Sequence, residues 1–426
     1  MSGCEEAKMD FGNHPCFNAE KRHSTGRIHL PVAQRCNIQC NFCNRKYDCV
    51  NESRPGVTSR VLTPMQAVSY LESVLEKTGN ISVVGIAGPG DPFANPEETL
   101  STLERIREKY KEKVLCVATN GLGLPDYVDD LARLAISHVT VTVNTVDPEI
   151  GKKIYPWVRL GRNIYRGAPG AEILLERQTE GIKRLKAKGL TVKINTVIIP
   201  GINDSHAEEV ARYTAGLGAD IQNCIPMMHV EGTVFETIAP PEPQHIEALR
   251  LKTAKHLAQM SHCARCRADA AGIIGGENPA ETAGLLEAAA APKPDEMRPY
   301  VAVASMEGLF VNRHLGEATQ VWIFGIEDGK VTLKEQRPTP PPGSGDRRWL
   351  DLARILHDCV ALQVSDCGKN PKEILEKHGV QVMSVEGLIA DTVSPILEGR
   401  QVPGVYRARR QCGAGVSCGG TGMGCG

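Results

Sequence analysis

The chain has 426 residues, which is long for one typical domain and enough to bury a sizeable core. Its 49 basic and 50 acidic residues nearly cancel and only 4% of residues are aromatic, which argues against nucleic acid as the main partner. The first residues, MSGCEEAKMDFGNHPC, show no export signal, and no apolar run approaches the length of a membrane span. We therefore expect a cytoplasmic protein, in which fifteen cysteines indicate metal or redox sites rather than disulfides.

Short β-rich runs alternate with helical patterns from about residue 27. The expected strands cover 27–34, 81–87, 113–119, 138–144, 190–199 and 220–227. The expected helices begin at Thr63-Pro64 and then cover roughly 97–109, 125–134, 176–188 and 207–217. Six βα units in series predict an α/β fold with a parallel sheet, either doubly wound or closed towards a barrel. Polar or glycine-rich residues follow every strand, so we expect one active-site mouth at the carboxyl ends of the strands.

The rest of the chain predicts a second folding unit. A helix of roughly 244–261 leads to HCARCRAD, and residues 275–297, rich in Ala, Pro and Glu, are interpreted as a linker. Residues 298–402 predict a small mixed α/β domain with a hairpin around Asp328-Gly329. Residues 403–426 form a tail rich in Gly and Cys, in which Cys412, Cys418 and Cys425 are either a transient cluster site or part of an unstructured end.

The stretch CNIQCNFCNRKYDC, residues 36–49, carries the strongest chemical motif. Cys36, Cys40 and Cys43 form C-x3-C-x2-C in the loop after the first strand, and three thiolates can hold a [4Fe–4S] cluster while leaving its fourth iron open. That iron can chelate S-adenosylmethionine (SAM), whose reductive cleavage gives a 5′-deoxyadenosyl radical. The alternative is a zinc site that joins Cys40 and Cys43 to Cys263 and Cys266.

This motif, after the first strand of a six-unit partial barrel, resembles that of the radical SAM family. AGPGDP, which follows the second strand, is similar to the glycine-rich SAM motif of that family, although a tight turn would also explain it. For Ile194 the resemblance implies an apolar contact to adenine, and plain barrel core is the alternative. The resemblance thus implies SAM contacts at Gly88, Gly90, Asp91, Thr119, Asn120, Thr142, Asn144 and Ile194.

Residues 14–275 more specifically resemble the radical SAM maturases of nitrogenase iron–molybdenum cofactor biosynthesis. The resemblance implies two further [4Fe–4S] clusters, K1 and K2, as substrates. Cys16, His29 and Cys49 would hold K1, and the second set would hold K2: Cys116, Cys263 and Cys266. From the residues alone, the alternative for His29 is a satisfied core histidine and the alternative for Cys116 is an inert buried thiol. Cys224 is expected to belong to the core.

The resemblance also implies a reaction and its partners. Of two SAM molecules, one would give its methyl group to a sulfide of K2 and the other would be cleaved to abstract hydrogen from that methyl. The carbon would become a carbide as K1, K2 and one extra sulfur fuse into an eight-iron precursor, which is lyase-class chemistry. The implied partners are iron–sulfur cluster donors, cofactor carrier or scaffold proteins, and a ferredoxin- or flavodoxin-like electron donor, with neither nucleic acid nor a membrane.

Residues 298–400 resemble the NifX/NifY cofactor-carrier family, most clearly in GLFVNRHLGEATQVWIF, and this implies a ribonuclease H-like carrier domain. His314 is then a candidate cofactor ligand, with a surface turn histidine as the alternative. The insertion at residues 157–172 carries Arg159, Arg162 and Arg166, which are interpreted as a solvated face, with contact to the SAM carboxylate or to an acidic delivery partner as the alternatives.

Two other functions stay open on the sequence. One is a radical SAM enzyme whose additional clusters relay electrons while it modifies an organic or peptide substrate. The other is an iron–sulfur scaffold without enzymatic activity.

Overall fold

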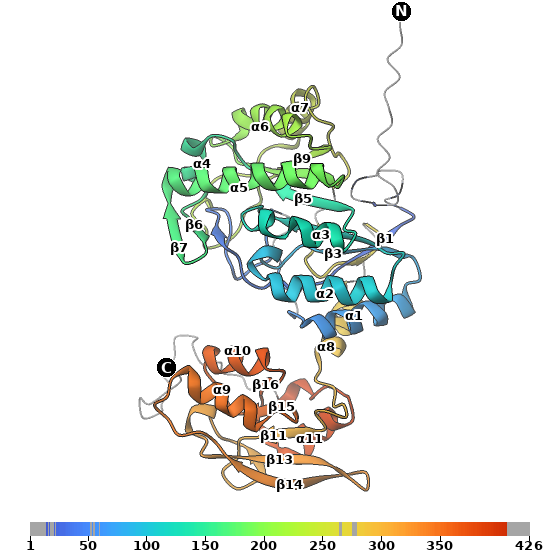
Figure 1. Cartoon of the computed structure of the whole chain (residues 1–426), viewed down its shortest axis with the longest axis vertical. Coiled ribbons are helices and arrows are strands. Elements are labelled where there is room, and N and C mark those ends of the chain that lie inside the picture. The colour runs from blue at the N-terminus through green and yellow to red at the C-terminus, as the bar shows by residue number, and fades with distance from the viewer. Residues whose placement is uncertain are drawn as a thin grey trace, which may run out of the picture. The chain divides into compact units, whose positions relative to one another are not determined.

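The computed structural model describes residues 14–15, 17, 21, 23–51, 53, 56–58, 60–263, 266–274 and 279–406. The chain divides into two compact units, Met1–Ala290 and Ala291–Gly426, whose elements are labelled in Figure 1. Among the described residues, no helix is both long enough and apolar enough to span a membrane.

The first unit is built on a seven-stranded sheet with the order β10-β1-β3-β4-β5-β8-β9. Six strands pair in parallel, and β10 (Ala271–Gly272) runs antiparallel to β1 at the edge. The parallel strands are β1 (Gly26–His29), β3 (Ile81–Ile86), β4 (Val114–Thr119), β5 (His138–Thr142), β8 (Thr191–Ile198) and β9 (Ile221–Pro226). All six predicted strands are therefore confirmed, and β1 ends shortly before Pro31, which has no N–H to continue a ladder.

Helices follow the strands and bury their apolar faces, as in other α/β folds. They are α1 (Pro64–Lys77), α2 (Pro96–Lys109), α3 (Val128–Arg133), α4 (Pro148–Ile154), α5 (Gly167–Ala187) and α6 (Ala207–Gly216), with short 3-10 turns at Pro92–Ala94, Leu124–Tyr127 and Asp204–His206. The predicted start of α1 is confirmed, because Thr63 caps the helix and forms a capping box with Gln66. Tyr70, Leu103 and Ile182 are fully buried in the resulting core.

Two predicted segments after β9 differ from the structure. The helix expected over 244–261 is α7 (Pro243–Thr253), which ends early because the chain then runs beside β9 and Gln222 exchanges backbone hydrogen bonds with Ala258 and Met260 at 2.7 Å. The segment expected to be a linker contains α8 (Pro279–Ala290). Its apolar residues pack onto the core around α1, and Gln66 donates to the Ala290 carbonyl at 3.0 Å.

The insertion at residues 157–172 has a structural role that the sequence does not reveal. It forms the hairpin of β6 (Trp157–Leu160) and β7 (Asn163–Arg166), followed by the start of α5. Strand β6 pairs antiparallel with β2 (Ile38–Gln39), which lies inside the cysteine motif, and the Arg159 N–H donates to the Asn37 carbonyl at 2.8 Å. The insertion therefore holds the cysteine loop, while its three arginines are exposed as expected.

The second unit is a mixed sheet with helices on both faces. The five-stranded order is β14-β13-β11-β15-β16, and Asp328 and Gly329 make the predicted hairpin turn with positive φ of 52° and 75°. Trp349 packs against one face of the sheet and Val393 against the other. The elements are β11 (Tyr300–Val303), β12 (Phe310–Val311), β13 (Gln320–Glu327), β14 (Lys330–Pro338), α9 (Asp346–Ile355), β15 (Cys359–Val364), α10 (Lys369–Lys377), β16 (Gln381–Ser384), β17 (Gly387–Leu388) and α11 (Ile389–Leu397), with 3-10 turns at Leu315–Glu317 and Gly404–Tyr406.

Candidate active site

The cysteine motif forms a compact set of thiols at the exit of β1. The Cys43 N–H donates to the Cys40 carbonyl at 3.0 Å, and β2 holds the loop between Cys36 and Cys40. Burial, and then the neighbouring Asp91 carboxylate, raises the pKa of Cys36 to about 12. Burial followed by the thiols of Cys43, Cys36 and Cys49 holds the pKa of Cys40 well above its usual range. Buried sulfurs that disfavour one another's ionisation fit a bound cation, because metal ligation requires and stabilises thiolates.

Asp91 connects the cysteine loop to the exits of two strands. Its carboxylate accepts hydrogen bonds from the Asn120 N–H at 2.6 Å and the Thr119 hydroxyl at 2.9 Å, and its own N–H donates to the Arg35 carbonyl at 2.8 Å. Burial raises the pKa of Asp91, and these hydrogen bonds oppose the rise. The Asn120 side-chain nitrogen lies 3.7 Å from the Cys36 sulfur. Three of the predicted SAM contacts, Asp91, Thr119 and Asn120, thus lie beside the cysteine motif, and Asp91 accepts a hydrogen bond from Thr119 there.

The two predicted glycines are required by close packing. A Cβ on Gly90 would lie 2.1 Å from the Arg35 carbonyl oxygen, which no side chain tolerates. Gly88 has a φ of +147°, and a Cβ there would meet Ala268 at 3.2 Å. These contacts bring the exit of β3 against the cysteine loop, so the turn has a packing reason, and SAM contact at Gly88 and Gly90 stays a prediction.

Of the remaining predicted SAM contacts, Thr142 ends β5, Asn144 follows that strand and Ile194 lies on β8. Thr142 and Asn144 are buried, and the Asn144 side-chain oxygen accepts from the Val197 N–H at 2.8 Å. Ile194 is fully buried in the core that includes the helices, whereas its neighbours Lys193 and Asn195 line a cavity on the opposite face. Ile194 is therefore a core residue in this structure, which matches the alternative to an adenine contact.

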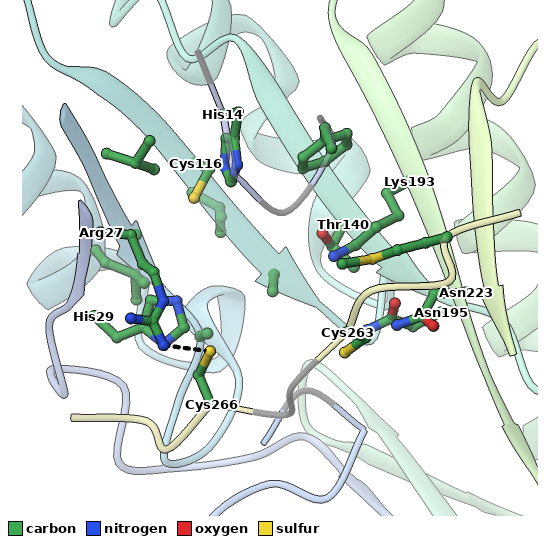
Figure 2. A pocket seen from close by; sticks show the side chains of 18 of the residues that line it. His14, Arg27, His29, Cys116, Thr140, Lys193, Asn195, Asn223, Cys263 and Cys266 are labelled. Atoms are coloured by element: carbon green, nitrogen blue, oxygen red, sulfur yellow. Dashed lines mark hydrogen bonds between the residues drawn. The ribbon is translucent and has the colours of Figure 1, made fainter. Parts of the chain in front are cut away.

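Four of the predicted cluster ligands line one cavity on the face of the sheet opposite Ile194 (Figure 2). Water-sized molecules can occupy about 60 Å³ of this cavity. His29 comes from β1, Cys116 from β4, and Cys263 and Cys266 from the segment after α7. The rest of the lining mixes apolar residues such as Val83, Ile86 and Met260 with polar and aromatic ones, among them His14, Phe17, Arg27, Thr140, Lys193, Asn195 and Asn223.

The hydrogen bond of His29 prepares its ring for metal binding. The Nδ1 atom lies 3.0 Å from the Arg267 carbonyl oxygen, and since a carbonyl only accepts, Nδ1 carries the proton and Nε2 has the lone pair. Burial, and then the Arg27 guanidinium, lowers the pKa of His29 to about 4, so the ring is neutral near pH 7. A Cβ on Gly85 would lie 2.9 Å from the Cys116 sulfur and 3.3 Å from the His29 ring. The missing side chain of Gly85 therefore leaves space beside both predicted ligands.

The cavity also carries positive charge. Arg27 is fully buried and donates to the Cys266 sulfur and to the Gly272 carbonyl, both at 2.6 Å. Lys193 is 7% exposed, and the described lining contains no Asp or Glu. Nearby cations favour thiolates and anionic ligands, so this charge suits thiolate-bound iron–sulfur substrates.

The other predicted ligands are not brought into this cavity. Cys49 is absent from the described lining; its N–H donates to the Pro89 carbonyl at 3.0 Å, and it is near Cys40 and Arg45. Cys16 and the tail residues Cys412, Cys418 and Cys425 lie outside the described residues. Within the described ranges, no group of three His, Cys, Asp or Glu residues is arranged to hold a single metal ion. Among the described residues, His29 thus lines the same cavity as the predicted K2 set.

Two further predicted roles can be located. Cys224 is fully buried in a small core cluster, as expected. In the second unit, His314 is half-buried at the start of a 3-10 turn, and its Nδ1 accepts a hydrogen bond from the Gly316 N–H at 3.1 Å. In the neutral ring the proton is then on Nε2, so neither nitrogen offers an unused lone pair in this conformation.

Sequence reasoning missed several polar residues of the cavity. Lys193 and Asn195 alternate with apolar residues in LTVKINTVII, and Arg27 and His29 alternate in RIHLP, which is the pattern of a strand with one polar face. A parallel strand buried on both faces normally reads as continuously apolar. The alternating polar residues in these strands were therefore the sequence signal for a polar cavity, and Asn223 in DIQNCIPM is a further such residue.

Comparison with known proteins gives two family matches. Residues 30–214 match the radical SAM superfamily, and residues 297–399 match the family described as dinitrogenase iron-molybdenum cofactor. The FeMo cofactor biosynthesis protein NifB of Chlorobaculum tepidum is 52% identical over 98% of this chain and 99% of its own length. The proteins of that name from Klebsiella pneumoniae and Azotobacter vinelandii are 40% and 37% identical, covering 86% and 88% of this chain and 86% and 85% of their own lengths. The chain therefore belongs to the NifB family of radical SAM enzymes, with the iron–molybdenum cofactor domain at its C-terminal end.

Proposed function

We propose that this chain acts in FeMo cofactor biosynthesis by fusing two [4Fe–4S] clusters, a carbide derived from SAM and one extra sulfur into an eight-iron precursor. The observation that carries the proposal is the cavity in which His29, Cys116, Cys263 and Cys266 meet, since these residues are additional to the radical SAM motif. The name shared by its relatives, FeMo cofactor biosynthesis protein NifB, supports the same pathway.

Cys36, Cys40 and Cys43 are the proposed ligands of the resident [4Fe–4S] cluster, which supplies the electron for SAM cleavage when it is bound. Asp91 and Asn120 fix the loop that carries these thiols, and the Asn120 amide is directed at Cys36. The proposed SAM contacts follow the carboxyl ends of the strands: Gly88, Gly90, Asp91, Thr119, Asn120, Thr142 and Asn144.

The substrate clusters are proposed to bind through three protein ligands each. Cys16, His29 and Cys49 would hold K1, and Cys116, Cys263 and Cys266 would hold K2. In support, Nδ1 of His29 is committed to the Arg267 carbonyl, which orients Nε2 as a ligand, and Arg27 favours the thiolate of Cys266. Three ligands leave one iron of each cubane without a protein bond, which suits a cluster that must later leave.

Two SAM molecules are consumed in the proposed reaction. One loses its methyl group to a sulfide of K2 and yields S-adenosylhomocysteine. The other would be cleaved to methionine and a 5′-deoxyadenosyl radical, which takes one hydrogen atom from that methyl and becomes 5′-deoxyadenosine. The remaining two hydrogens would leave as protons, and the iron of the two substrate clusters would supply the electrons that bring the carbon to the carbide level. No protein nucleophile is needed, so the residues of this chain bind, orient and exclude water.

Iron–sulfur cluster donors, cofactor carrier proteins and a ferredoxin- or flavodoxin-like reductant are the proposed partners. The second unit would receive the product, as its match to the iron–molybdenum cofactor family supports. Tethering a carrier to the enzyme raises the local concentration of the receiving site.

The test replaces Cys263 and Cys266 together with alanine in the full chain. After anaerobic reconstitution with iron and sulfide, we expect the eight-iron product to be lost while 5′-deoxyadenosine is still formed. The matched control is Cys224→Ala, which removes a buried thiol outside the cavity and should retain the product. Normal product yield from the double variant would refute the K2 assignment, and loss of SAM cleavage as well would indicate a folding defect, which the iron content of the Cys36 motif would reveal.

A further inference from the structure

We propose that Thr140, Lys193 and Asn223 form a subsite for a small oxyanion on the β5–β8–β9 wall of the cavity. The subsite goes beyond the proposed function, because none of these residues is a proposed iron or SAM ligand. Figure 2 shows Thr140 beside Lys193, and Asn195 beside Asn223, across the cavity from Arg27 and His29.

Asn223 is the first observation. Its side chain is 1% exposed and lines the cavity, yet neither its amide nitrogen nor its amide oxygen has a hydrogen-bond partner among the described residues. A buried polar group without a partner is destabilising, and a bound molecule or ion is one of the explanations for such a group in a native protein. Asn223 is held by register opposite Asn195, which fixes its place on the wall.

Lys193 is the second, independent observation. It lies opposite Thr140 in the register of β5 and β8, and its ammonium is 5.1 Å from the centroid of the Phe17 ring. No carboxylate of the described residues lies within ion-pair distance of Lys193, and none lines the cavity. A buried cation without a carboxylate partner among the described residues is poorly compensated, and an anion would compensate it.

The chemistry of the donors selects the class of ligand. The ammonium of Lys193, the amide of Asn223 and the hydroxyl of Thr140 are hard hydrogen-bond donors, and they suit the oxygens of an oxyanion. Across the cavity, the thiolates and the imidazole are soft or borderline ligands suited to iron. The cavity therefore has two chemically different sides. Its oxyanion has two possible sources: a free inorganic oxyanion, or the carboxylate of a second SAM-type molecule.

Calorimetric titration of the iron-free, reduced full chain tests the subsite without loading any cluster. Sulfate is the probe for an inorganic oxyanion, and S-adenosylhomocysteine is the probe for a carboxylate. We expect one of the two to bind the unaltered chain, with affinity at least about tenfold weaker in both Lys193→Met and Asn223→Asp. Asn223→Asp keeps the side-chain shape but adds a negative charge, so it decides the matter if Lys193→Met does not fold. Circular dichroism checks the fold of each variant.

The control is Lys153→Met, which removes an exposed lysine on α4 and should leave binding unchanged. Equal weakening in this control would mean that only the general charge of the protein attracts the probe, which overturns the proposal. Absence of binding by either probe, or full affinity in Asn223→Asp, overturns it as well. Because no iron is present, either failure leaves the cluster assignment to be judged by the Cys263 and Cys266 variant.

Discussion

His29 in the first unit and His314 in the second were both predicted as ligands, but their rings make opposite hydrogen bonds with the backbone. The Nδ1 of His29 donates to a carbonyl oxygen, so its Nε2 has a lone pair for iron. The Nδ1 of His314 accepts from a backbone N–H, so its lone pair is already used and the proton is on Nε2. The contrast teaches that the partner of the first ring nitrogen decides whether the second can bind a metal. The hydrogen bond of His29 therefore leaves Nε2 able to bind a metal, whereas His314 could bind one only after its turn rearranges.

The largest expected effect is on SAM cleavage, which we expect to depend on the cysteine motif and on neither histidine. Replacing Cys40 with alanine removes one thiolate of the radical SAM motif, and we expect formation of 5′-deoxyadenosine to fall by more than about 100-fold, because even indirect changes around metal ligands cost 10–100-fold. Product analysis by chromatography after anaerobic reduction measures it. His314→Ala is the comparison variant and should cleave SAM at the normal rate; equal loss in both would contradict the division of roles.

A second experiment compares the two histidines directly. His29→Ala should weaken iron retention in the cavity by about 10–100-fold, because a prepared ligand is lost, whereas His314→Ala should leave that retention unchanged. The measurement is the iron content after gel filtration of chains that also carry Cys36→Ala, Cys40→Ala and Cys43→Ala, so that the remaining iron reports on the other sites. Unchanged iron content in His29→Ala would show that the ring is only a satisfied core residue.

The smallest expected effect concerns the space beside His29. Gly85→Ala would place a methyl group 2.9 Å from the Cys116 sulfur, and overpacking of this kind costs about 1–3 kcal/mol. We expect a lower thermal midpoint and reduced cluster binding in the cavity. Gly79→Ala is the matched control, because a Cβ there meets nothing within 4 Å. If the two variants have the same thermal midpoint and the same cluster binding, Gly85 does not set the geometry of the ligands.

Much of the fold was predictable because strand and helix periodicities are local. All six parallel strands, the cap at Thr63 and the turn at Asp328-Gly329 follow from short patterns. Helix α8 was missed because the Pro and Gly residues in and around it suggest a linker, although Ala, Leu and Glu favour a helix; its apolar residues pack against the core around α1. The pairing of β2 with β6 was also missed, since it joins segments more than a hundred residues apart, as Ile38 and Val158 show.

The candidate site was predictable as a set of ligands but not as a grouping. The types and spacing of the cysteines indicate iron chemistry, and four of the predicted ligands meet in one cavity. Which of them are neighbours depends on tertiary structure: Gly85 brings Cys116 near His29, while Cys49 is near Cys40. The cations are harder to foresee, because only the tertiary structure buries Arg27 beside the Cys266 sulfur and Lys193 on the same cavity wall as Asn223.

The pairing of the cysteine loop with the β6–β7 hairpin has a consequence for the newly made chain. Cys36, Cys40 and Cys43 leave the ribosome early, but β6 and the Asn120 amide that hold them are synthesised much later. Until residue 166 has emerged, the three thiols are on an unsupported segment and are open to oxidation. Insertion of the first iron–sulfur cluster is therefore expected to follow synthesis of this hairpin, and the nascent thiols need a reducing environment in the interval.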